Sequence, residues 1–199
     1  MVPGNIEPLV TERLVLRPLS GSDEAAIHSY RSDPAATRYL SHDPLTVEEN
    51  RERLTELLAL CRASTGTWFN YGWGITLRES GELVGDARTW NSTGMAATGL
   101  LAPGTHPAGH AALAYVLHPD HHHRGYGREA AAALVKWLVT QCGISTVVAA
   151  VYEPNSRSIR LLQSLGFRPD STLPADQATA GKGFPLLTFR LDSPHRSSD

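Results

Sequence analysis

A short segment in the second half of the chain has the residue types that bind phosphate groups. It lies between an expected strand and an expected helix, and Gly125 and Gly127 alternate there with basic and aromatic residues. Glycine lets a bulky anion approach the backbone N–H groups, and the N-terminus of a helix attracts negative charge. Guanidinium groups add charge-assisted contacts to phosphate oxygens. The residues expected to bind such an anion are His122, His123, Arg124, Gly125, Tyr126, Gly127 and Arg128.

The segment 122–128 is also compatible with an ordinary strand-to-helix turn, so the elements around it matter. Period-two alternation and β-branched residues predict strands at 14–19, 73–77, 83–90, 110–117, 146–152 and 186–191. Helical spacing, capping signals and glycines after last turns predict helices at 22–31, 46–61, 128–141 and 155–165. The Gly- and Pro-rich segments 91–109 and 169–185 are expected to be loops. This order indicates an α/β fold with a mixed sheet.

Composition narrows the class of protein. The chain has 199 residues, with 41% hydrophobic and 19% charged residues, as is typical of a globular domain. The chain has 18 Lys and Arg and 20 Asp and Glu, so it carries no net positive charge. Neither nucleic acid nor an anionic membrane is therefore an expected partner. No apolar run approaches the roughly 20 residues needed to span a bilayer, and a cytoplasmic location is expected. Cys61 and Cys142 are expected to pack as free thiols.

Three blocks of sequence resemble a known family. The segment His122–Gly127 is similar to the acetyl-CoA loop of the GNAT superfamily of N-acetyltransferases, written Q/R-x-x-G-x-G/A, with His122 in place of Gln or Arg. Asn155–Phe167 resembles the family block that contains Asn, Ser and Leu before Gly-Phe. Thr11–Leu19 resembles the first strand of the RimJ/RimL branch, which acetylates ribosomal protein N-termini. The resemblance covers nearly the whole chain except 91–109 and 169–185.

The resemblance implies a fold and a co-substrate. It implies a mixed, mostly antiparallel sheet of about six to seven strands with about four helices, in one domain over 1–192 with a frayed tail at 193–199. Acetyl-CoA would be the co-substrate, without a metal. Its pantetheine arm would lie in a gap between strands 112–117 and 146–152, beside the backbone of Val116, Leu117 and His118. Backbone groups in such a gap would otherwise lack partners.

The resemblance also implies catalytic residues. Acetyl transfer in the family is direct, so no cysteine nucleophile is needed. Ser158 matches the position near the CoA sulfur, where a hydroxyl can protonate the leaving thiolate, although a serine there also fits a bond to a helix carbonyl. Asn155 would cap the same helix and contact the pantetheine arm.

The general base is less well specified by the sequence. Many relatives have Glu where this chain has Ala112. His110 lies two residues earlier on the same strand face, and an imidazole with a pKa near ~6.5 can accept a proton from an ammonium. Asp86 and a chain of water molecules are the alternatives, as is a His110 that is simply half-exposed.

Several other residues have two interpretations. Tyr115 is assigned to packing, because aromatic residues in strands are ordinarily core. The run His121–His123 suggests a metal site, but adjacent side chains point apart and no carboxylate or cysteine completes a ligand set. The cluster Trp68, Phe69, Tyr71 and Trp73 is assigned to the core rather than to an acceptor pocket.

The sequence therefore predicts an N-acetyltransferase that moves an acetyl group from acetyl-CoA to a primary amine. The acceptor is either a protein N-terminus or a small amine such as an antibiotic or metabolite. A non-catalytic acyl-CoA-binding sensor is the alternative, because Ala112 lacks the carboxylate of many relatives. A homodimer is possible, since relatives often dimerise, and the acyl-chain preference is open.

Overall fold

The protein is described by a computed structural model over residues 6–65, 68–91, 109–176 and 182–193. The expected loop 91–109 and the expected frayed tail 193–199 therefore lie almost wholly outside the described residues. The described strands form one sheet in the order β1-β2-β3-β4-β5-β6-β8-β7. They are β1 (Leu9–Val10), β2 (Leu14–Pro18), β3 (Asn70–Leu77), β4 (Leu83–Trp90), β5 (His110–Leu117), β6 (Thr146–Tyr152), β7 (Arg168–Leu173) and β8 (Leu186–Asp192).

The mixed, mostly antiparallel sheet confirms the fold class, but the expected count of six to seven strands is too low. Eight strands are present in the described residues. Strand β1 has two residues, too few for a sequence pattern. All of strand β7 except its first residue lies in the segment 169–185 that was expected to be a loop. It pairs with β8 through a register shift near Pro169, which fits the edge position where proline is tolerated.

Five α-helices lie in the described residues, one more than expected. They are α1 (Glu24–Arg31), α2 (Pro34–Thr37), α3 (Val47–Ala63), α4 (Tyr126–Thr140) and α5 (Ser156–Ser164), with 3₁₀ turns at Gly21–Asp23 and Pro119–His121. The predicted capping box starts α3, because Thr46 accepts from the Glu49 N–H and Glu49 accepts from the Thr46 N–H. The additional helix α2 is one turn long and is capped by Asp33.

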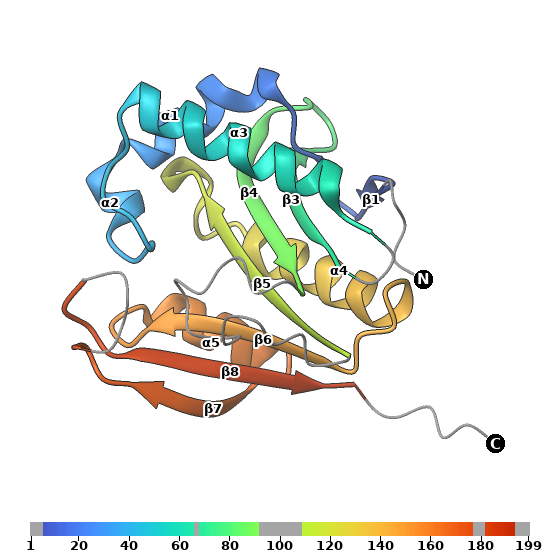
Figure 1. The fold of residues 1–199 in the computed structure, drawn as a ribbon, viewed down its shortest axis with the longest axis vertical. Coiled ribbons are helices and arrows are strands. Elements are labelled where there is room, and N and C mark those ends of the chain that lie inside the picture. The colour runs from blue at the N-terminus through green and yellow to red at the C-terminus, as the bar shows by residue number, and fades with distance from the viewer. Residues whose placement is uncertain (1–5, 66–67, 92–108, 177–181, 194–199) are drawn as a thin grey trace.

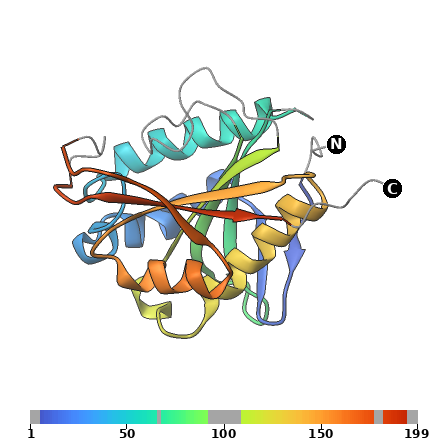
Figure 2. The same ribbon diagram turned by 90° about the horizontal axis from the view of Figure 1, so that it is seen from below.

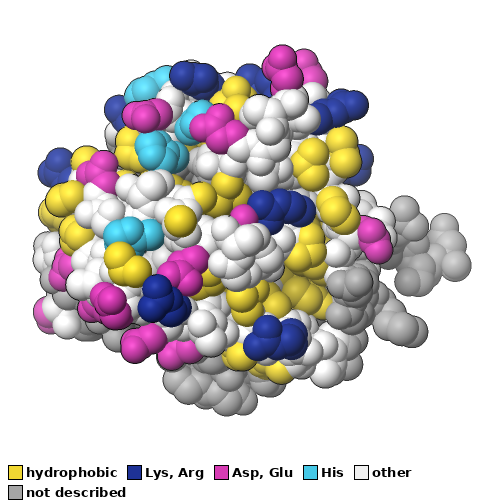
Figure 3. Space-filling view, turned by 90° about the horizontal axis from the view of Figure 1, so that it is seen from above, with side chains coloured by type: hydrophobic (Ala, Val, Ile, Leu, Met, Phe, Trp, Pro, Cys, Tyr) yellow, Lys and Arg dark blue, Asp and Glu magenta, His cyan; other side chains and the backbone are white. Residues whose placement is uncertain are grey.

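The helices form layers on both faces of the sheet. Figure 2 shows α4 and α5 on one face and α3 on the other, and Figure 1 places α1 beside α3. On the surface in Figure 3, charged side chains of both signs are interspersed, so that face has no broad area of one charge. No helix within the described residues has the length and apolar character needed to cross a membrane.

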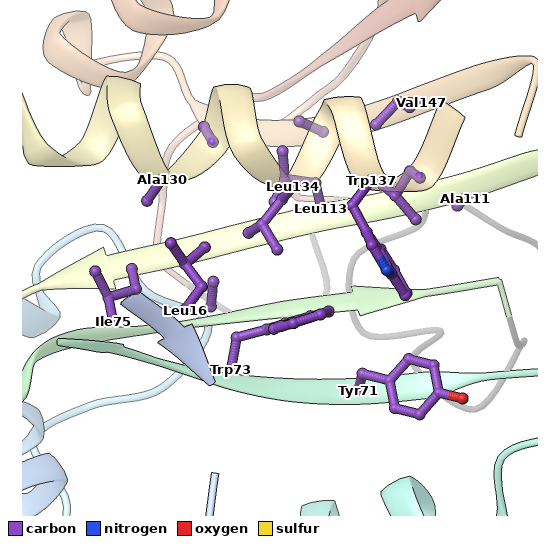
Figure 4. Packing of buried hydrophobic residues seen from close by; sticks show 14 of the residues in the cluster. Leu16, Tyr71, Trp73, Ile75, Ala111, Leu113, Ala130, Leu134, Trp137 and Val147 are labelled. Atoms are coloured by element: carbon purple, nitrogen blue, oxygen red, sulfur yellow. The ribbon is translucent and has the colours of Figure 1, made fainter. Parts of the chain in front are cut away.

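The main core lies between α4 and the sheet. Trp137 of α4 meets Trp73 of β3 edge to face, with ring centroids 5.0 Å apart (Figure 4). Phe69 and Tyr71 stack at 5.6 Å and also contact the Trp137 ring. All four side chains are buried, so Phe69, Tyr71 and Trp73 are core as predicted. Trp68, the fourth residue of the predicted cluster, is only half-buried. This packing fixes α4, and hence the candidate anion-binding loop at its N-terminus, against the sheet.

Candidate active site

Strands β5 and β6 separate along their length. They are parallel neighbours and pair at His110–Thr146, Ala111–Val147 and Ala112–Val148. No further pairing joins them within the described residues, although β5 continues to Leu117 and β6 to Tyr152. Figure 1 shows the two strands close at one end and apart at the other. Their facing backbone groups beyond Ala112 are therefore open to an extended ligand, as the sequence resemblance implied.

The candidate anion-binding loop leads from the open end of this gap into α4. Gly125 is the N-cap residue of α4 and has φ +80°, a conformation that residues with a Cβ rarely adopt. The first hydrogen bond along the helix runs from the Glu129 N–H to the Gly125 carbonyl. The N–H groups of Tyr126, Gly127 and Arg128 thus precede the intrahelical pattern, and such groups are the donors that bind phosphate at helix N-termini.

An arginine from the N-terminal part of the chain holds this loop. The Arg13 side chain donates to the Arg124 carbonyl at 2.8 Å and to Glu129 at 2.7–2.8 Å, and its backbone N–H also donates to Glu129. Its guanidinium lies 4.9 Å from the centre of the Tyr126 ring. Burial opposes the Glu129 charge, but hydrogen bonds from Thr11 and Arg13 outweigh it and lower the pKa of Glu129. No local sequence pattern indicates this clamp between Arg13 and Glu129.

The histidines near the loop have different surroundings. His122 hydrogen-bonds to the Leu117 carbonyl through Nε2 at 3.1 Å, and burial lowers its pKa. His123 is exposed and has φ +62°. The His118 N–H donates to the Val84 carbonyl at 2.8 Å, so a ligand would have to use the other groups of His118. No cluster of three potential metal ligands occurs among the residues that the structure describes.

A pocket of about 270 Å³ lies beside the separated strands, and residues from elements on both faces of the sheet line it. Ser158 and Asn155 line its α5 side, where the Asn155 side chain accepts from the Ser158 N–H at 3.2 Å. Tyr115 of β5 also lines the pocket. Burial raises its pKa, while hydrogen bonding with Ser158 opposes the rise. Tyr115 packs on the core as predicted, and its position in the pocket beside Ser158 also makes it a candidate site residue, which its strand pattern did not indicate.

The two candidate bases lie in different places. His110 starts β5 at the closed end, opposite Thr146, and is not among the described residues that line the pocket. Asp86 does line the pocket, and its carboxylate accepts from Tyr30 and Arg31, both at 2.6 Å. Burial disfavours the Arg31 charge, but attraction to Asp86 outweighs it and raises the pKa of Arg31. The structure therefore brings Ser158, Asn155 and Asp86 to one pocket and leaves His110 outside it.

Arg31 also connects Asp86 to a buried histidine. Its NH1 group lies 2.9 Å from His42 Nε2, and His42 Nδ1 lies 2.7 Å from the Asp43 carbonyl. Burial lowers the pKa of His42 to about 4. The neutral ring can therefore accept from Arg31 while it donates to the Asp43 carbonyl.

A family model matches most of the chain, including the separated strands and the loop at the head of α4. The acetyltransferase (GNAT) domain model matches residues 13–168. The chain belongs to the GNAT acetyltransferase family. It is therefore an acyltransferase of the GNAT type. An uncharacterized N-acetyltransferase, p20 of Bacillus licheniformis, is 27% identical over 187 residues, which span 94% of this chain and 96% of the relative.

Solved GNAT structures share the fold. An acetyltransferase (GNAT family) from Bacillus anthracis superposes with a TM-score of 0.75 at 18% identity, covering 94% of this chain and 98% of that one. RimL, a ribosomal α-N-protein acetyltransferase solved in complex with coenzyme A, gives a TM-score of 0.73 at 16% identity, with the same coverage. At these identities the similarity establishes the fold, including the likeness to RimJ/RimL-type structures that the first strand suggested.

Proposed function

We propose that this GNAT enzyme transfers an acetyl group from acetyl-CoA directly to the nitrogen of an amine. The observation that carries the proposal is the separation of β5 and β6 beyond Ala112, beside a pocket that contains Ser158. An extended pantetheine arm needs unpaired backbone groups, which the two diverging strands supply. The N–H groups at the head of α4 lie at the open end, where the pyrophosphate would bind. The structure of RimL, which has this fold, has been solved in complex with coenzyme A.

The chemistry requires orientation and two proton transfers. The amine, once neutral, attacks the thioester carbonyl carbon, so that a C–N bond forms and the C–S bond breaks. The nitrogen then loses a proton, and the sulfur gains one as the free thiol. Ser158, which lines the pocket together with Tyr115, is the proposed donor to the sulfur. Holding both reactants in one pocket supplies much of the rate acceleration.

The pocket favours an enzyme over a sensor that only binds acyl-CoA. It extends past the gap to the face covered by α1 and α3, where Ile27, Leu54 and Asp86 line it. A sensor needs the cofactor channel alone, whereas an acetyltransferase needs an adjoining space for the acceptor. Asp86 is the ionisable carboxylate in that space, and it can relay a proton from the acceptor ammonium through water, in place of a side chain at Ala112.

Calorimetric titration and a thiol-release assay test the proposal together. The purified protein should bind acetyl-CoA and CoA, and it should release free thiol only when an amine is present. Amines, amino acids and N-terminal peptides form the panel. Binding without thiol release from any amine would support the sensor instead, and no binding would overturn the proposal.

A further inference from the structure

The acceptor side of the pocket carries more positive than negative charge. Among the described residues that line the pocket, Asp86 is the one carboxylate, whereas the arginines are Arg31, Arg53 and Arg88. Asp86 is already paired with Arg31 at 2.6 Å. The charges of Arg53 and Arg88 therefore remain without a carboxylate from the pocket wall. Such a wall repels a polycationic acceptor and attracts an anionic one.

Arg88 lies next to the point where the strands separate. It is on β4, and its Cα partner on β5 is Ala114. Ala114 is two residues beyond Ala112, the last β5 residue that pairs with β6. Because side chains alternate along a strand, Arg88 shares a sheet face with Asp86, the face that α1 covers. Arg88 is thus on the strand next to β5, which borders the proposed thioester channel, and its side chain lines the same pocket.

The guanidinium of Arg88 retains hydrogen-bonding capacity. Its Nε donates to the Asn70 side chain at 2.6 Å, and the group lies 5.9 Å from the Trp90 ring centre. Within the described residues no carboxylate lies within 4.0 Å of it, although Asp86 and Glu56 attract it at longer range. Burial lowers the pKa of Arg88 to about 10, so it stays charged at neutral pH. Partial burial of a cation without an anion beside it costs free energy, because the charge loses hydration. A bound anion would offset that desolvation cost.

The internal segments that the structure does not describe contain no carboxylate side chain that could be that anion. The internal segments 66–67, 92–108 and 177–181 contain no Asp and no Glu. The anion proposed beside Arg88 is therefore not a side chain of these three segments, and the pocket beside Arg88 is where an acceptor would bind.

We propose that the acceptor is a small amine that also carries a carboxylate, of the amino-acid class, and that Arg88 binds this carboxylate. The proposal rests on the acetyltransferase function proposed above. A guanidinium matches a carboxylate with two parallel hydrogen bonds. In an amino acid the carboxylate is one carbon from the amine. A carboxylate held at Arg88 would therefore keep the nitrogen within the pocket that the gap between β5 and β6 also borders. A peptide N-terminus has an amide at that position and lacks this charge.

The test compares matched acceptors in the thiol-release assay with acetyl-CoA. Each free L-amino acid is assayed beside its own amide and beside a dipeptide amide with the same first residue. We expect kcat/KM to be about 100-fold higher for the best free amino acid than for its amide, as two charge-assisted hydrogen bonds would give. In Arg88→Gln this ratio should fall close to one, while Arg62→Gln, an exposed arginine outside this pocket, should keep it.

The outcomes are distinguishable. Equal rates for amino acids and amides, or a preference that persists in Arg88→Gln, would overturn the role of Arg88. A preference for dipeptide amides would overturn the acceptor class. Binding of acetyl-CoA without thiol release from any amine would instead overturn the proposed function, and the acceptor assignment with it. The wild-type comparison does not depend on the folding of a variant, and calorimetric binding of acetyl-CoA verifies each variant.

Discussion

Arg13 and Glu129 are joined by three contacts across 116 residues of sequence. The Arg13 backbone N–H and its Nε each donate to Glu129 at 2.8 Å, and NH2 lies 2.7 Å from the same carboxylate. The remaining Arg13 terminal nitrogen donates to the Arg124 carbonyl. The start of β2 is thereby bound to the first turn of α4. The contacts restrain the loop that we propose binds the pyrophosphate, so the loop is ordered before the ligand arrives.

Removal of the Glu129 charge should weaken cofactor binding. In Glu129→Gln the loop loses its ionic restraint, and we expect the Kd for acetyl-CoA to rise about 3- to 10-fold. Because Arg13 is partly exposed, the free energy of unfolding should fall by only about 1 kcal/mol. Glu48→Gln, which changes an exposed acid in the first turn of α3, is the control for both quantities. Calorimetry and urea denaturation measure them, and equal Kd values in the two variants would argue against the restraint.

A side chain at Gly125 should disturb the loop directly. A Cβ there would lie 3.2 Å from the Arg13 guanidinium, on a backbone with φ +80°. Gly81→Ala is a matched control, because Gly81 also has positive φ, at +75°, but has nothing within 4 Å of its Cβ position. Both variants should lose about 1 kcal/mol of stability from backbone strain. Only Gly125→Ala should also weaken acetyl-CoA binding, by about tenfold; unchanged binding would place the pyrophosphate elsewhere.

The proposed acid can be separated from a structural serine. Ser158→Ala should lower kcat about 100-fold with little change in the Kd for acetyl-CoA, because a proton donor acts in the transition state. Ser156→Ala alters an exposed serine two residues earlier in α5 and should leave kcat unchanged. Thiol release with the best amine measures both. A raised Kd with normal kcat in Ser158→Ala would instead assign Ser158 to binding.

The buried His42 should make stability depend on pH. Its pKa is lowered from 6.5 to about 4 in the folded protein, mainly by burial. Between these values the unfolded chain binds more protons than the folded one, so the free energy of unfolding decreases as the pH falls through this window. After allowance for solvent screening the loss is about 2 kcal/mol. Urea denaturation at about pH 7 and about pH 4.5 measures it.

His42→Gln isolates this contribution. Glutamine keeps an acceptor for Arg31 but does not titrate, so the difference in stability between wild type and variant should shrink as the pH falls. A constant difference over the window would show that His42 is not held neutral.

The main elements of the fold could be predicted because their patterns are local. The hairpin of β3 and β4 follows from two alternating strands around Glu79–Glu82, and α3 follows from the capping box at Thr46. The loop at Gly125 was identified from its glycines, and the resemblance to the family added the gap between β5 and β6. Strand β7 was missed because Pro169, Asp170 and Ser171 suggest a loop, and only pairing with β8 makes them a strand.

The parts of the site that depend on long-range contacts could not be predicted. Asp86 was considered as a base, but its pairing with Arg31 arises from the packing of α1 on β4. Arg88 lies in an alternating strand and looks like an ordinary solvent-facing residue. Its burial beside the pocket depends on α3 and on Asn70, neither of which a local pattern reveals. The clamp between Arg13 and Glu129 depends in the same way on β2 lying beside the head of α4.

Transfer of the acetyl group to an amine can be followed by mass spectrometry of an amine panel after incubation with the protein and isotopically labelled acetyl-CoA. We expect the label on the nitrogen of an amine, with one free thiol released for each acetyl group transferred. Acetyl-CoA that binds but stays intact with every amine, or a label that appears only as free acetate, would contradict transfer to an amine.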